Sequence, residues 1–146
     1  MHDRSATNLI ITVLAFDYGT RRIGVAIGNS LTQSGQALEV ISNKNRSEIL
    51  LTIEGLISHW QPSILLVGLP LFPDGTEHAM TAKAKRFGRQ LESRFAKPVR
   101  YVDERYSSAV LETDAQYRHT LDSHAAALLI EQFFRESTEK SKNSSI

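Results

Sequence analysis

Acidic residues stand at the ends of two predicted strands, where carboxylates can bind a metal ion. Asp17 ends an apolar run that begins at Leu9. Gly19 follows closely, and its missing Cβ lets a phosphate or an ion approach the backbone. The adjacent residues Asp103 and Glu104 stand at the end of a later predicted strand, 98–103. If the two strands run parallel, these acids meet at the edge where open α/β sheets bind ligands.

Only one of the two adjacent acids can readily face this site, because neighbouring side chains on a strand point to opposite faces. The longer side chain favours Glu104 as the metal ligand, which leaves Asp103 to pair with Arg105 or to cap the following helix. Strand parity by itself leaves the choice between Asp103 and Glu104 open.

A third carboxylate, Asp122, is predicted in the first turn of the last helix, where the helix dipole alone would favour an acid. The alanines at 125–127 allow this helix to pack close to the sheet and bring Asp122 toward Asp17. Three carboxylates supply the hard oxygen ligands that Mg²⁺ or Mn²⁺ prefers. Such a set indicates a nuclease, since bound ions activate water and neutralise charge in phosphodiester hydrolysis.

Basic and small residues near the acids are candidates for binding nucleic acid. Some flank the acids in sequence, and two lie one turn apart on the exposed face of a predicted helix. Few aromatic residues are interleaved with them, which favours phosphate contacts over base stacking. With a net charge of +1, a merely solvated surface is the alternative. The predicted contact residues are Gly19, Thr20, Arg21, Arg22, Lys85, Arg89 and Arg105.

Hydrophobic periodicity predicts one α/β domain over residues 9–136, with flexible tails at 1–8 and 137–146. Three strands in antiparallel succession are followed by two strands reached through helical crossovers, giving a mixed five-stranded sheet with helices on both faces. Asp74 and Glu77 are predicted to cap the helix that ends near Phe95. The predicted strands are 9–17, 22–29, 37–42, 63–69 and 98–103, and the predicted helices include 46–60, a segment from about 107, and 121–136.

Composition supports a globular domain and narrows its chemistry. Hydrophobic residues make up 41% of the 146 residues and charged residues 23%. The absence of cysteine excludes disulfides and thiol nucleophiles. No apolar run approaches the roughly 20 residues needed to cross a bilayer, and the polar start does not resemble a secretory signal. We therefore expect a cytoplasmic protein with no membrane partner.

Four sequence blocks in this order resemble the YqgF family, also called RuvX, of the RNase H-like superfamily. The resemblance extends over about residues 14–134. The first block, FDYGTRRIGVA at 16–26, matches the family pattern almost throughout. The others are VGLPL at 67–71 with DGTE at 74–77, DER at 103–105 with SS at 107–108, and DSHAA at 122–126.

This resemblance implies an RNase H-like fold and a divalent-metal nuclease with Asp17, Glu104 and Asp122 as its acids. It also implies a precursor ribosomal RNA as partner, in maturation of the 5′ end of 16S rRNA.

Three alternatives stay open, together with the oligomeric state. One is a resolvase of four-way DNA junctions, which would act as a symmetric dimer. The others are a catalytically silent RNA-binding module and a phosphate-binding module related to actin-like ATPases, which need two such domains.

Overall fold

The computed structural model describes residues 9–104 and 118–144, and within the last helix it describes the side chains of residues 123–137. Strands and helices alternate after an opening meander of three strands. The elements are β1 (Thr12–Tyr18), β2 (Arg22–Asn29), β3 (Gly35–Ser42), α2 (Arg46–Trp60), β4 (Ile64–Leu69), α3 (Ala79–Phe95), β5 (Val99–Asp103) and α4 (Arg118–Ser144).

The five strands form one mixed sheet in the order β3-β2-β1-β4-β5. β1 pairs antiparallel with β2, and β2 pairs antiparallel with β3, because their short connections permit only hairpins. β4 pairs parallel with β1 and with β5, so β1 and β5 run in the same direction. The predicted topology is confirmed, and the carboxyl ends of β1, β4 and β5 share one edge.

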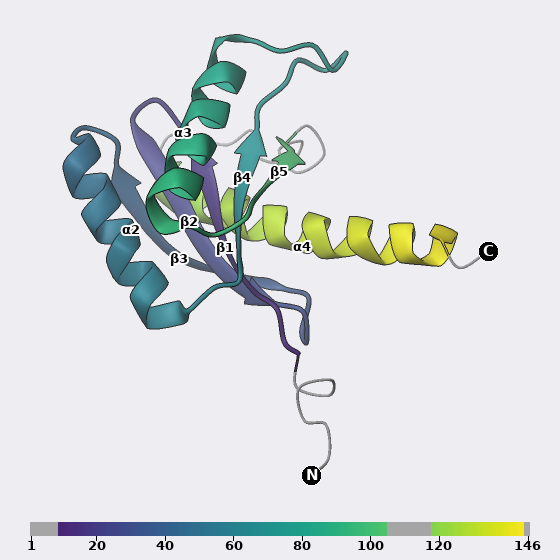
Figure 1. Ribbon diagram of the computed structural model, residues 1–146. Coiled ribbons are helices and arrows are strands. Elements are labelled where there is room, and N and C mark those ends of the chain that lie inside the picture. The colour runs from purple at the N-terminus through teal and green to yellow at the C-terminus, as the bar shows by residue number, and fades with distance from the viewer. Residues whose placement is uncertain (1–8, 105–117, 145–146) are drawn as a thin grey trace.

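Helices cover both faces of this sheet, with α2 and α3 on one face and α4 on the other (Figure 1). Alternation along each strand sends neighbouring side chains into different cores. On β1, Phe16 packs in the core with α2 and α3, whereas Ala15 packs in the core with α4. On β5, Val102 likewise belongs to the α4 core. A residue two positions beyond Ala15 on β1, or beyond Val102 on β5, therefore also faces α4.

The cap of α3 differs from the prediction. His78 is the N-cap: its Nδ1 accepts a hydrogen bond from Met80 N at 3.2 Å, and its own N donates to Thr81 Oγ1 at 3.1 Å. Asp74 instead accepts from Thr76 N at 3.0 Å within the preceding loop. The prediction of Asp74 and Glu77 was wrong because Glu77 pairs in a bridge that closes this loop before the helix begins.

The last helix is longer than predicted at both ends. It begins at Arg118, which places Asp122 in the second turn, and it continues through Ser144. The predicted tail from residue 137 thus starts inside α4, because this polar stretch has no apolar periodicity that could indicate a helix. The segment predicted as helical from residue 107 lies outside the described residues. Across the described ranges, no helix has both the length and the apolar character needed to cross a membrane.

Candidate active site

Asp17 and Glu104 meet at the carboxyl edge of the sheet, on the face covered by α4. Asp17 lies two residues beyond Ala15, and Glu104 lies two residues beyond Val102, so both follow residues of the α4 core. The Glu104 carboxyl donates a hydrogen bond to the Asp17 carboxylate. The structure therefore brings together two of the three predicted acids.

A glycine on the strand between them makes this contact possible. Gly68 lies on β4, which separates β1 from β5, and it pairs with Val102. A Cβ built at Gly68 would come within 2.7 Å of both Cγ and Oε1 of Glu104. No real Cβ approaches a carbon so closely. The absence of a side chain at Gly68 therefore leaves the space through which Glu104 reaches toward Asp17.

The two carboxyl groups of this pair share one proton. Burial, then the hydrogen bond to Asp17, then the charges of Asp17 and Asp103 raise the pKa of Glu104 to about 10. At neutral pH the proton on Glu104 thus holds two carboxyl groups together that would otherwise repel each other. A divalent cation can take the place of that proton, since carboxylate oxygens are the ligands of Mg²⁺ and Mn²⁺.

Asp103 lies on the other side of the sheet. It follows Tyr101 by two residues, and Tyr101 packs against Gly88 of α3. Its backbone oxygen accepts a hydrogen bond from Gln132 Nε2 at 3.0 Å, which ties the end of β5 to α4. Strand alternation therefore separates Asp103 from Glu104. Its predicted pairing with Arg105 lies outside the described residues.

The third predicted acid, Asp122, belongs to α4, but its side chain lies outside the described part of the chain. The small residues that follow do pack close to the sheet, as predicted. Ala126 and Ala127 are buried, and a Cβ at Gly35 of β3 would collide with the backbone of Ala127. Among the side chains that are described, no group of three or more histidines or acids could hold a metal ion.

A tight turn joins Asp17 to the predicted phosphate-binding residues. Gly19 N donates to Arg22 O at 2.9 Å across the turn. Asn43, at the end of β3, holds it twice: its backbone N donates to Arg21 O, and its Nδ2 donates to Gly19 O, each at 2.8 Å. Sequence analysis missed Asn43, because the 24 residues that separate it from Gly19 give no local signal.

A second contact from Asn43 reaches Tyr18. Burial raises the pKa of the Tyr18 hydroxyl, but hydrogen bonds to Asn43 and Arg46 and the charge of Arg46 outweigh it, and the pKa is lowered. The Arg46 guanidinium also lies 5.7 Å from the centre of the Tyr18 ring. Tyr18 thus links Asn43 to Arg46 at the start of α2.

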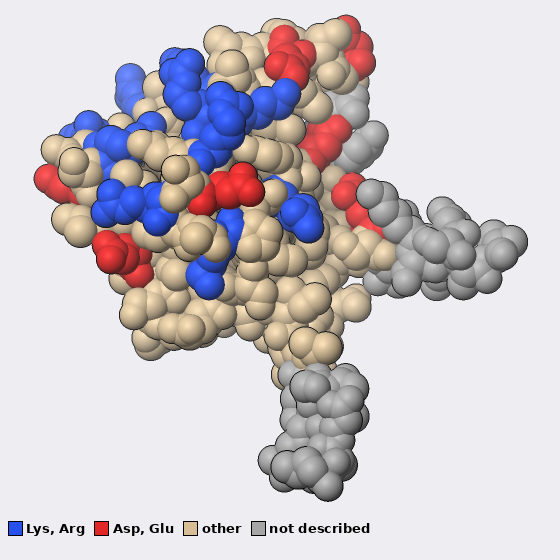
Figure 2. All heavy atoms as spheres, in the orientation of Figure 1, with Lys and Arg blue, Asp and Glu red and all other residues tan. Residues whose placement is uncertain are grey.

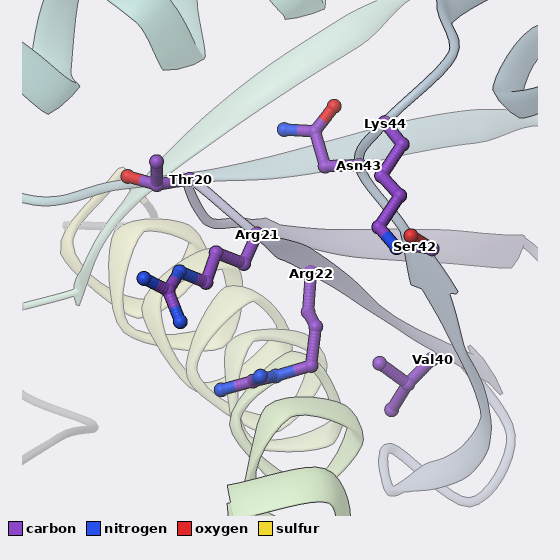
Figure 3. Close-up of a pocket in the computed structure, with 7 residues that line it drawn as sticks. All are labelled: Thr20, Arg21, Arg22, Val40, Ser42, Asn43 and Lys44. Atoms are coloured by element: carbon purple, nitrogen blue, oxygen red, sulfur yellow. The ribbon is translucent and has the colours of Figure 1, made fainter.

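A hollow of about 510 Å³ opens beside this turn, between the start of β2 and the end of β3 (Figure 3). Arg21 and Arg22 extend on one side of it, and Lys44 folds back toward Ser42 on the other. A smaller hollow of about 230 Å³ adjoins it at Gly19. The residues lining the larger hollow are Thr20, Arg21, Arg22, Val40, Ser42, Asn43 and Lys44.

Lys85 and Arg89 lie elsewhere, on α3. The backbone oxygen of Lys85 accepts a hydrogen bond from the Tyr101 hydroxyl at 3.2 Å, which places this part of α3 against the opposite face of β5 from Glu104. The Lys85 ammonium forms an ion pair of 2.5 Å with Glu77. Lys and Arg side chains gather over α3 in Figure 2, on the side of the molecule that α2 and α3 cover.

The sheet order, with helices on both faces of the sheet, gives an α/β protein with an RNase H-like fold. *Thermus thermophilus* RuvC in complex with a Holliday junction substrate has the same fold, with a TM-score of 0.59, 14% identity, and coverage of 88% of this chain and 96% of that one. The fowlpox virus Holliday junction resolvase gives a TM-score of 0.51 and 12% identity, and covers 88% of this chain and 99% of that one. At these identities the likeness shows the fold alone.

Sequence comparison identifies the family. The RuvX profile, described as "Holliday junction resolvase", matches residues 11–136. A protein of *Polynucleobacter necessarius* named "Putative pre-16S rRNA nuclease" is 57% identical over 126 residues, which is 86% of each chain. One of the same name from *Burkholderia vietnamiensis* is 50% identical over 133 residues, 86% of this chain and 89% of that one. The chain belongs to the RuvX family, which confirms the resemblance read from its motifs.

Proposed function

We propose that this protein is a divalent-metal-dependent nuclease that hydrolyses phosphodiester bonds of precursor 16S rRNA during maturation of its 5′ end, in the cytoplasm. The observation that carries the proposal is the contact between Asp17 and Glu104 at the carboxyl edge of the sheet. Two carboxyl groups held together by one proton, in a chain of the RuvX family, are suited to exchange that proton for a divalent cation.

Asp17, Glu104 and Asp122 would hold Mg²⁺ or Mn²⁺. When bound, the ions would supply charge neutralisation and an activated water. The residues of the chain would position the ions and the substrate. Asp17 and Glu104 would present their oxygens to those ions from two parallel strands of the sheet, and the space at Gly68 lets Glu104 reach toward Asp17. The backbone at Gly19 lets a phosphate approach closely.

Nucleic-acid binding is proposed at Gly19, Thr20, Arg21, Arg22, Lys85, Arg89 and Arg105. The turn residues among them are close to Asp17 in sequence and are held by Asn43. Arginine suits this role because its planar guanidinium can donate two parallel hydrogen bonds to a phosphate. The RNA substrate is proposed from the names of two relatives at 50% identity or more, both called pre-16S rRNA nucleases.

A cleavage assay on precursor 16S rRNA and on a four-way DNA junction, run side by side, tests the proposal. We expect the rRNA to be cut near its mature 5′ end with Mg²⁺ or Mn²⁺ and to stay intact with EDTA. Asp17→Asn protein serves as the control for contaminating nucleases. Absence of metal-dependent cleavage of either substrate would contradict the nuclease and favour a silent RNA-binding module.

The second candidate is a junction resolvase, which the description of the matching family profile favours. A resolvase cuts two strands symmetrically and would therefore act as a dimer. Paired cuts in the four-way junction, with no cleavage of the rRNA, would select this function instead.

A further inference from the structure

Two basic regions of this protein lie on different sides of the sheet, and only one of them shares a face with the carboxylates. The alternation of side chains along β2 determines which region this is. Asp17 pairs with Gly24, and Arg22 lies two residues from Gly24 on the same face. Arg22 in turn pairs with Ser42, and Gly24 pairs with Val40. The strand residues that line the large hollow therefore face the α4 side, as Asp17 does.

The basic residues of α3 lie across the sheet from this site. Lys85 is positioned by Tyr101, whose side chain points to the α3 face of β5. Its charge is already partly neutralised by Glu77. The hollow at β2 and β3, rather than α3, therefore lies on the same face of the sheet as Asp17.

Hydrogen bonds to the backbone hold the walls of the hollow in position. Asn43 joins its two walls through hydrogen bonds of 2.8 Å to Arg21 O and to Gly19 O. Asn45 continues the ordered wall by capping α2, with its Oδ1 accepting from Glu48 N at 3.2 Å. Between these residues the side chain of Lys44 is exposed and borders the hollow. A ligand would meet a largely preformed site, which lowers the entropy lost on binding.

We propose that this hollow binds the sugar-phosphate backbone of the strand that is cleaved, with Lys44 as a positioning residue that contacts a phosphate beside the scissile one. The proposal rests on the proposed nuclease function. Arg22 is about 7 Å along β2 from the position opposite Asp17. That distance corresponds to about two nucleotides of a stacked strand at roughly 3.4 Å each. The same strand can therefore occupy the carboxylate site and the hollow together.

The chemistry of the lining favours a polyanion over a small neutral ligand. Three cationic side chains, Arg21, Arg22 and Lys44, border the hollow, and its described lining includes no acid. The hydroxyls of Thr20 and Ser42 add hydrogen-bond donors for phosphate or ribose oxygens. Base stacking is not expected, since the lining offers no aromatic ring.

The test measures binding of single-stranded RNA to the full chain without divalent ions, so that cleavage plays no part. Lys44→Ala should weaken binding about five-fold and reduce the slope of log affinity against log salt by about 0.7, the change for one lost phosphate contact. Lys44→Arg should restore both values. Lys97→Ala is the matched control: it removes the same charge from the segment before β5, at the amino edge of the sheet, and should change neither value.

A scan with single methylphosphonates then locates the contact. Removing the charge of one phosphate should weaken binding to the wild-type protein at a position within about two nucleotides of the scissile bond. At that position the loss should disappear in Lys44→Ala protein. Equal affinities for the wild type and Lys44→Ala, or losses at every phosphate that are the same in both, would overturn the proposal. Because the readout is binding, it stands apart from a failure to cleave rRNA.

Discussion

The side chain of Glu104 occupies the volume that a side chain at Gly68 would fill, with Cγ and Oε1 of Glu104 both 2.7 Å from the position of the missing Cβ. The Glu104 side chain can therefore reach across β4 and donate a hydrogen bond to the Asp17 carboxylate. This arrangement explains why the acid that follows β5, rather than the acid that ends it, lies beside Asp17. It also makes Gly68 a residue whose replacement should disturb the site without disturbing the core.

Gly68→Ala is expected to lower nuclease activity at least about ten-fold while the protein stays folded. The added Cβ collides with a flexible side chain, so Glu104 moves away from Asp17 and the backbone stays in place. Misplacement of a reacting group by about 1 Å is enough for a large loss of rate. Cleavage rates and circular dichroism provide the measurement.

Gly55→Ala is the matched control for this substitution. A Cβ at Gly55 would meet nothing within 4 Å, and the residue lies inside α2. It should leave activity unchanged and stabilise the protein by about 0.5–1 kcal/mol, because alanine favours a helix more than glycine does. Full activity of folded Gly68→Ala protein would show that the space at Gly68 has no part in the site.

Asp17→Asn should reduce metal-dependent cleavage by about a hundred-fold or more, because the substitution keeps the shape and removes the charge that a divalent ion needs. The fold should persist, and the melting temperature without metal should stay close to that of the wild type, since the amide oxygen can still accept the hydrogen bond from Glu104. A folded Asp17→Asn protein that cleaves at the wild-type rate would show the site assignment to be wrong.

Glu104→Gln should cost much more activity than Asp103→Asn. Glu104 contacts Asp17 on the α4 face, whereas alternation along β5 turns Asp103 to the other face. The comparison requires single-turnover cleavage rates for both variants, with melting curves to establish folding. The reverse order of rates would reassign the ligand to Asp103.

The stability of the metal-free protein should fall as pH rises between about 4.5 and 10. In the unfolded chain Glu104 loses its proton near its ordinary pKa of 4.5, whereas the folded chain keeps the proton up to about 10. The contribution of this group is fully present below pH 4.5 and is lost progressively as pH rises through the folded pKa. Melting temperatures of the wild type minus those of Glu104→Gln, taken across this range, isolate the effect. A difference that does not change with pH would contradict it.

Added Mg²⁺ or Mn²⁺ should reverse this trend. Because the cation competes with the proton on Glu104, the rise in melting temperature on adding metal should be larger at about pH 8 than at about pH 6. EDTA should abolish the rise at both values, and Glu104→Gln protein should show a smaller rise than the wild type. An equal rise at both pH values would indicate binding away from this pair.

Replacing Lys85 and Arg89 together with alanine should weaken RNA binding only modestly, by about two-fold, and flatten the salt slope by no more than about 0.7. The ion pair with Glu77 already neutralises part of the Lys85 charge, and this face of α3 lies across the sheet from Glu104. Filter binding at several salt concentrations measures both quantities. An unchanged affinity and slope would remove α3 from the RNA surface.

Local patterns determined the elements of this protein and its family. Residues Arg46–Trp60 repeat apolar side chains at helical spacing, and the structure forms α2 over the same range. The short connection from Tyr18 to Arg22 allowed only a hairpin, and the nearly wholly apolar β4 indicated a strand buried on both faces. Such signals act between residues close in sequence, so they can be read without a structure.

The tertiary structure decided what depends on neighbours far apart in the chain. Whether Asp103 or Glu104 approaches Asp17 follows from which core receives Val102 and from the space at Gly68, neither of which is visible in the order of residues. The hydrogen bond from Asn43 Nδ2 to Gly19 O, which holds the turn after β1, joins residues 24 positions apart in the sequence. The sequence supplied the side chains for a metal site, whereas sheet order and strand alternation determined which of them share a face, because that depends on strand pairing across the whole chain.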